Sequence, residues 1–140
     1  MKLNPHGVRV LFLVGLVIFA TSGFSEEIYG QTSKSSLKDE IKNDLALVAP
    51  NAVALAQVAA ANCGEDATAQ RLETELLIIA GKVMQSPLRV RQILKDEQIA
   101  MGYREGNPVG PCKPERNQNA VSTAEKRLAD LRDKIESYKN

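Results

Sequence analysis

NAVALAQVAAAN, residues 51–62, decides how this chain folds, because it is apolar on nearly every side of a helix. Alanine has the highest helix propensity, and its small side chain lets neighbouring helices approach closely. A helix that is apolar all round lies in the interior of a protein. We therefore predict a central, buried helix that ends at Gly64, just after Cys63. The same row of small side chains has an alternative interpretation, as the floor of a groove for a small apolar ligand.

Apolar residues recur at helical spacing on both sides of this segment. Before it, the spacing predicts a helix that starts at Ser36, whose hydroxyl can cap the first turn, and that stops or kinks at Pro50. After it, the spacing predicts a helix over residues 66–85. Ser86-Pro87 then predicts the start of a further helix, which ends at Gly102. The apolar stripes are formed by Leu37, Ile41, Leu45 and Val48, by Leu72, Leu76, Ile79 and Val83, and by Val90, Ile93 and Leu94.

Residues 102–119 are too rich in glycine and proline for a regular helix, so we predict a long loop there. Ser122, followed three residues later by Glu125, forms a capping box and predicts the start of the last helix. The apolar residues of that helix follow a heptad-like seam, which predicts packing on its own bundle. Self-association along the seam is the alternative. The seam is formed by Leu128, Leu131, Ile135 and Tyr138.

The chain contains two cysteines, Cys63 and Cys112. Two cysteines in an exported chain most often pair with each other. Such a bond would close a loop of about 50 residues and contribute about 4 kcal/mol on the chain-entropy model. Two buried thiols and an intermolecular bridge are the alternatives.

These patterns together predict an all-α fold, a small bundle of four to five helices with one intramolecular disulfide. The bundle is expected to occupy residues 36–140 as a single domain. Residues 26–35 are polar and small, which predicts a flexible leader.

The first 25 residues have the pattern of a secretory signal peptide. Lys2 and Arg9 give a positive head, residues 10–20 are apolar and uncharged, and small residues follow. Cleavage is expected after Ser22 or Ser25. The predicted location is therefore periplasmic or secreted, with no membrane span after processing. An uncleaved membrane anchor is the alternative, although the apolar stretch is shorter than the roughly 20 residues that a spanning helix needs.

The sequence lacks the residues of several common chemistries. His6 is the only histidine and lies in the predicted signal peptide, so the mature chain has no Ser-His-Asp or Cys-His catalysis and no histidine-ligated metal. Removing Lys2 and Arg9 leaves 16 of the 18 basic residues against 17 acidic ones, a balance that gives no long-range attraction to nucleic acid. We expect no catalytic residues, no metal site and no cofactor, and an enzyme that uses carboxylates or lysine is the least favoured hypothesis.

The predicted function is that of a non-enzymatic protein–protein interaction or accessory module, with a protein partner in the cell envelope or outside the cell. Tyr103 and Arg104, an aromatic beside a cation in the long loop, are the candidate partner-binding residues. An ordinary loop contact with the bundle is the alternative role for them. A binder of a small apolar ligand within the bundle is the alternative function.

Overall fold

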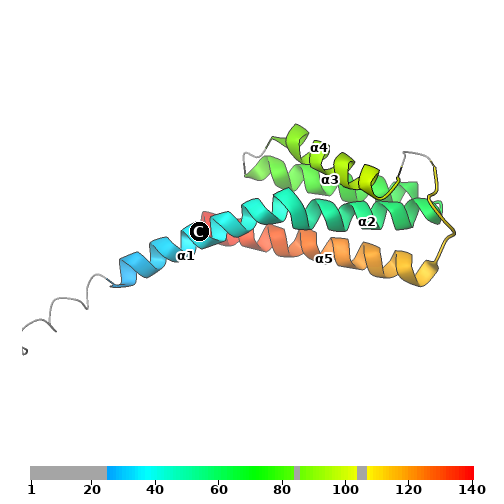
Figure 1. Ribbon diagram of the computed structural model, residues 1–140. Helices are drawn as coiled ribbons and strands as arrows, with labels where there is room; N and C mark the ends of the chain where they lie inside the picture. The colour runs from blue at the N-terminus through cyan, green and yellow to red at the C-terminus, as the bar shows by residue number, and fades with distance from the viewer. Residues whose placement is uncertain (1–24, 84–85, 104–106) are drawn as a thin grey trace, which may run out of the picture. The chain divides into compact units, whose positions relative to one another are not determined.

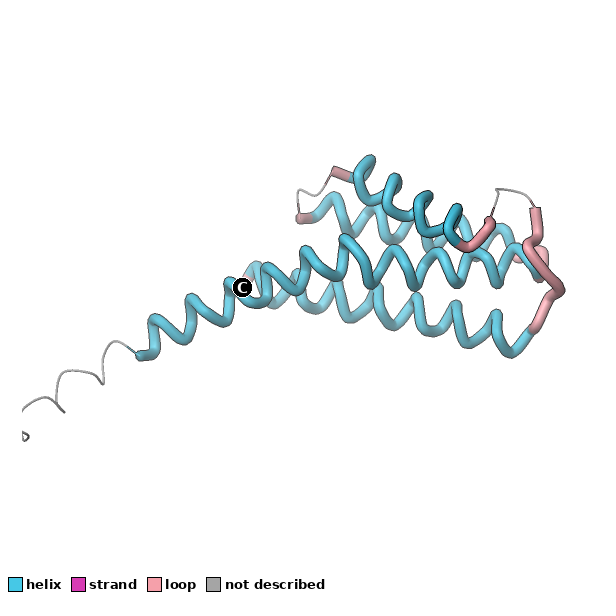
Figure 2. The backbone as a smooth tube through the Cα atoms, viewed as in Figure 1, coloured by secondary structure: helices cyan, strands magenta, loops and turns pink. Residues whose placement is uncertain are grey.

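The computed structural model describes residues 25–83, 86–103 and 107–140 (Figure 1). These residues form helices and contain no β-strand, so the all-α prediction is confirmed for the described part of the chain (Figure 2). The bundle lies within the compact unit Ser36–Asn140. The elements, in chain order, are α1 (Ser25–Asn43), the π-helical turn η1 (Asp44–Val48), α2 (Ala49–Asn62), α3 (Asp66–Lys82), α4 (Pro87–Ala100) and α5 (Pro114–Lys139).

The first helix begins earlier than predicted. α1 starts at Ser25 and not at Ser36, so residues 26–35 are helical rather than a leader without secondary structure. Once a helix exists, each added residue forms one hydrogen bond for one residue fixed, and only the first turn is costly. A polar composition alone therefore does not end a helix that is already anchored downstream. Residues 1–24 of the predicted signal peptide lie outside the described residues.

The helix continues through Pro50 after a widened turn. The backbone N–H of Ala49 donates to the carbonyl oxygen of Asp44, five residues back, and η1 is the resulting π-turn. Proline lacks an N–H and crowds the turn before it, and a π-turn is a common way for a helix to take up such a local irregularity. The predicted interruption at Pro50 is therefore a change of helical register and not a stop.

Because the helix is continuous through Pro50, it is as long as a membrane-spanning helix. Residues 33–62 form a 30-residue helix whose most apolar window has a mean hydropathy of 1.5, which is enough to cross a membrane by length and composition alone. The predicted interruption at Pro50 would divide this stretch into two shorter helices, whereas the helix is continuous and reaches spanning length. Half of that window is buried inside the protein, as in the core helix of a folded domain.

α2 is the central helix of the bundle, as its composition predicts. It packs against α3, α4 and α5, and its alanines let these neighbours approach closely. Val53, Ala54, Ala56 and Ala60 have no exposed surface. Its buried polar residue, Gln57, is satisfied, because its Nε2 donates to the Ala69 carbonyl at 3.2 Å and its Oε1 accepts from Gln98 Nε2 at 2.6 Å.

The apolar seam of α5 faces the interior of its own bundle. Leu128, Leu131 and Ile135 are at most 1% exposed, and Tyr138 packs against the core partly buried. The interpretation that this helix packs on its own bundle is confirmed. Self-association of the chain stays a prediction, although these side chains already contact the other helices of their own bundle.

α5 begins at Pro114, so the predicted start at Ser122 is wrong and the loop ends at Lys113. Proline is well suited to the first helical position, where its missing N–H would have no partner in any case. The N–H of Asn117 donates to the Lys113 carbonyl at 2.9 Å and closes the first turn. The prediction that α4 starts at Ser86-Pro87 is confirmed.

Candidate functional site

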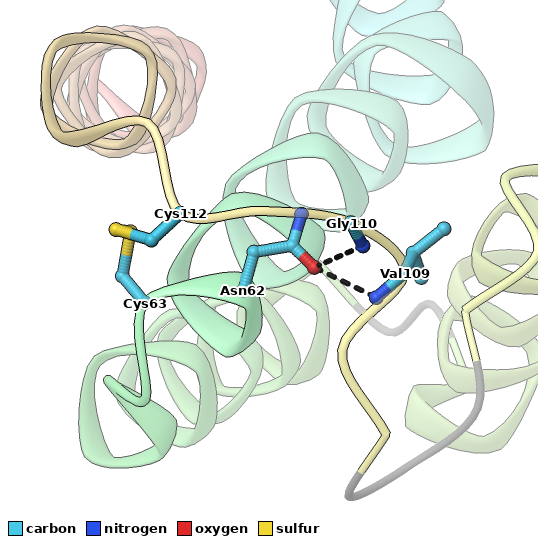
Figure 3. The surroundings of a disulfide bond; sticks show 5 residues. All are labelled: Asn62, Cys63, Val109, Gly110 and Cys112. Carbon is cyan, nitrogen blue, oxygen red and sulfur yellow. Dashed lines mark hydrogen bonds between the residues drawn. A yellow bond between two sulfur atoms is a disulfide. The ribbon is translucent and has the colours of Figure 1, made fainter.

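A disulfide links the end of α2 to the loop before α5. Cys63 and Cys112 are bonded, with their Cα atoms 4.6 Å apart, and the two residues are separated by 49 positions in sequence (Figure 3). The predicted intramolecular pairing is confirmed. The bond fixes the C-terminal part of the loop beside α2, directly before α5 begins.

A second attachment lies next to the disulfide. The side-chain oxygen of Asn62, Oδ1, accepts hydrogen bonds from the backbone N–H groups of Val109 at 2.7 Å and of Gly110 at 3.0 Å (Figure 3). Asn62 is the last residue of α2, so its side chain reaches past the helix end. The role of Asn62 has no signal in the sequence, because an asparagine before a glycine-containing turn indicates only a helix end. Asn62, the last residue of α2, and Cys63, the residue after it, therefore hold the loop in place.

The loop held in this way forms one end of a groove that runs along α2. The groove has a volume of about 1130 Å³ and is open to solvent. Its floor comes from one stripe of η1 and α2, and its long wall is the outward face of α5. The floor is formed by Leu47, Asn51, Ala52, Leu55, Val58 and Ala59. The alternative interpretation of the alanine-rich segment, a groove floor, is consistent with this position.

The groove exists because the helices that pack on α2 leave one strip of its surface uncovered. α4 and α5 each pack on α2 but have no substantial contact with one another, and α2 lies between them in Figure 1. The strip of α2 between them stays uncovered. Leu47 is therefore 54% exposed and Leu55 45% exposed, and Val109 of the loop is 46% exposed at the groove end. Three large apolar side chains thus face solvent within one concave surface.

The α5 wall of the groove is cationic. Lys113, Arg116 and Arg127 line it, and the described lining residues include no acidic side chain. Within the described part of the chain these three cations form no ion pair, whereas Arg71, Arg91, Arg132 and Lys134 each lie within 4.0 Å of a carboxylate. The groove therefore combines an apolar floor with one wall of unpaired positive charge.

A smaller hollow of about 260 Å³ lies on the other side of Arg127. Its lining places the carboxylates of Asp44, Asp130 and Asp133 near Arg127 and Lys134. Of the two cations, Lys134 forms ion pairs, because its Nζ lies 2.7 Å from Asp44 Oδ2 and 3.5 Å from a Glu40 carboxylate oxygen. The hydrogen bond to Asp44 raises the pKa of Lys134 above its ordinary value, against the opposing effect of burial. This cluster attaches α5 to η1 and the end of α1, which gives it a structural role.

Of the two residues predicted to bind a partner, Tyr103 lies just after the end of α4. Tyr103 is half-buried, and its N–H donates to the Gln98 carbonyl at 2.8 Å, while Arg104 lies outside the described residues. Tyr103 is not among the described residues that line the groove. Their role as partner anchors therefore stays a prediction.

Among the described residues, no group of three histidine, cysteine, aspartate or glutamate side chains could hold a metal ion. Comparison with protein-family models, curated proteins and solved structures finds no match to this chain. What can be said of its function comes from the groove itself.

Proposed function

We propose that this protein is an exported, non-enzymatic module that binds another protein through the groove along α2. The observation that carries the proposal is the exposure of Leu47, Leu55 and Val109 within one concave surface. Exposed apolar patches with a polar rim are typical of protein-binding sites. The disulfide and the bonds of Asn62 pre-order the groove end, which lowers the entropy lost on binding.

Export rests on two features that agree with each other. The first 25 residues have the signal-peptide pattern, and a disulfide is typical of proteins in oxidising compartments. Mass spectrometry of the protein from its native host is expected to find a chain that starts at Gly23 or Glu26. A full-length chain retained in membranes would instead support the uncleaved anchor.

Site-specific crosslinking in the native host tests the proposed docking. A photo-crosslinking amino acid, benzoylphenylalanine, replaces Leu55 on the groove floor, and we expect a discrete covalent adduct with one protein after irradiation. Leu88 provides the matched control, because it is a 72% exposed leucine on α4 that does not line the groove. Benzoylphenylalanine in place of Leu88 is expected to give less than about one tenth of the adduct obtained at Leu55, since contacts outside a specific interface are transient. Equal adducts from both positions, or none from Leu55, would contradict the proposal.

The second function, binding of a small apolar ligand, is favoured by the alanine-lined floor. Ala52 and Ala59 leave room above α2, as small side chains on a groove floor would. The groove is open along its side, however, whereas small-molecule sites usually enclose most of the ligand surface. A Leu55 crosslink to lipid alone, with no protein adduct, would select this function over protein docking.

A further inference from the structure

We propose that the groove along α2 binds an acidic amphipathic α-helix of the partner. The proposal rests on the proposed function and specifies the chemistry of the occupant. Three properties of the groove support it, namely its length, its apolar floor and the distribution of its cations.

The length of the groove suits a helix. Its floor extends from Leu47 to Asn62, and at 1.5 Å per residue this corresponds to about 22 Å. A helix of about 14 residues has the same length. Because α4 and α5 lie on either side of α2 without packing on each other, a helix laid along the floor would fill the uncovered strip in the manner of one more bundle member.

The apolar floor presents side chains at the spacing that a helix can match. Leu47, Leu55 and Val58 lie on one stripe of the floor, separated by two helical turns and then by one. Helix-in-groove recognition uses apolar anchors at positions i, i+3 or i+4, and i+7 of the bound helix. Val109 at the loop end offers a further apolar contact. The floor thus favours a ligand with apolar groups repeated along its length.

The cations decide between a helix and a lipid anion. Arg116 and Arg127 lie eleven positions apart on α5, which corresponds to about 16 Å along the helix axis. A fatty acid has one carboxylate at one end and can pair with only one of them. A helix with acidic residues along one flank can pair with both, and also with Lys113. Exposed ion pairs contribute little to affinity, so we expect the charges to act mainly on the choice of partner.

Two matched peptides test this inference directly on the purified, oxidised protein. Both are side-chain-stapled helices, because short helices are marginal in water, and both carry leucines at i, i+4 and i+7. One has glutamates along one flank and the other has lysines at the same positions. By fluorescence anisotropy at low salt, the glutamate peptide is expected to bind at least tenfold more tightly.

Charge reversal in the groove should invert this preference. In Arg116→Glu with Arg127→Glu, the lysine peptide is expected to become the tighter ligand. The control is Lys95→Glu with Lys126→Glu, which makes the same change in net charge at exposed positions that do not line the groove, and it should keep the original order. If the reversed variant does not fold, as judged by circular dichroism, Arg116→Gln with Arg127→Gln should abolish the preference.

Three results would overturn the inference. The first is equal binding of the two peptides. The second is an order of affinity that the groove reversal leaves unchanged. The third is occupation of the groove by something else, either a fatty acid such as oleate that binds while neither peptide does, or a second copy of the chain detected by sedimentation equilibrium and abolished by Leu55→Glu. The Leu55 crosslink distinguishes failure of this inference from failure of the proposed function. A protein adduct at Leu55 without a preference for the glutamate peptide would contradict the acidic helix but would still support docking of a protein in the groove.

Discussion

Replacing Leu128 with alanine is expected to lower the free energy of unfolding by about 2–5 kcal/mol. Leu128 has no exposed surface and belongs to the core cluster that joins α5 to the other helices. Alanine in its place would lose the transfer free energy of the missing atoms and would leave a cavity that the close-packed helices cannot fully close. Because domains of this size have only about 5–15 kcal/mol of net stability, the change should be evident in a urea denaturation curve.

Leu55→Ala is the matched control for this experiment. The same atoms are removed from a leucine in a helix, but Leu55 is 45% exposed on the groove floor. Its cost is expected to stay below about 1 kcal/mol, as for substitutions outside a packed core. Equal costs for the two variants would show that the α2 stripe is covered in solution and that the groove is not open.

Removing the disulfide is expected to have an effect of similar size. The variant Cys63→Ser with Cys112→Ser should lose about 2–5 kcal/mol, because the bond restricts a long loop in the unfolded chain. The two cysteines are 49 positions apart in the sequence. The measurement is chemical denaturation of the variant and of the native protein with and without reductant.

Reduction of the native protein should reproduce the loss seen in the serine variant. On a non-reducing gel the native protein is expected to run as a monomer, slightly faster than its reduced form. Two titratable thiols in the unfolded, oxidised protein would show that the bond does not form in solution.

The helices could be predicted because their signals are local. The apolar spacing of residues 66–83 and the Ser86-Pro87 pair each act within one or two turns, and α3 and α4 lie where these signals place them. The disulfide could be predicted from the number of cysteines and the inferred export. Two of the errors, at Pro50 and at Pro114, involve proline, whereas the early start of α1 at Ser25 does not. Proline disfavours a helix interior but is favoured in the first turn of a helix. The sequence alone does not show that Pro114 occupies the first turn of α5.

The groove could not be predicted from the sequence, because it depends on α4 and α5 having no substantial contact with each other. Leu55 and Leu128 are both leucines in helices predicted to pack in the bundle, yet Leu55 is 45% exposed and Leu128 is fully buried. The difference arises because α4 and α5 leave a strip of α2 uncovered, which is set by the packing of helices distant in sequence. The cations of α5 likewise indicate a binding site only because the apolar floor of α2 lies beside them in the folded protein.

The link between Cys63 and Cys112 also gives the groove an order of assembly. A chain emerging from the ribosome into a reducing cytoplasm has no such bond, and its loop could then be attached to α2 only through the hydrogen bonds that Val109 and Gly110 donate to Asn62. If the protein is exported as proposed, the end of the groove would be covalently fixed only when the thiols are oxidised after transport. Oxidation and the ability to bind the proposed partner would then begin together, outside the cytoplasm.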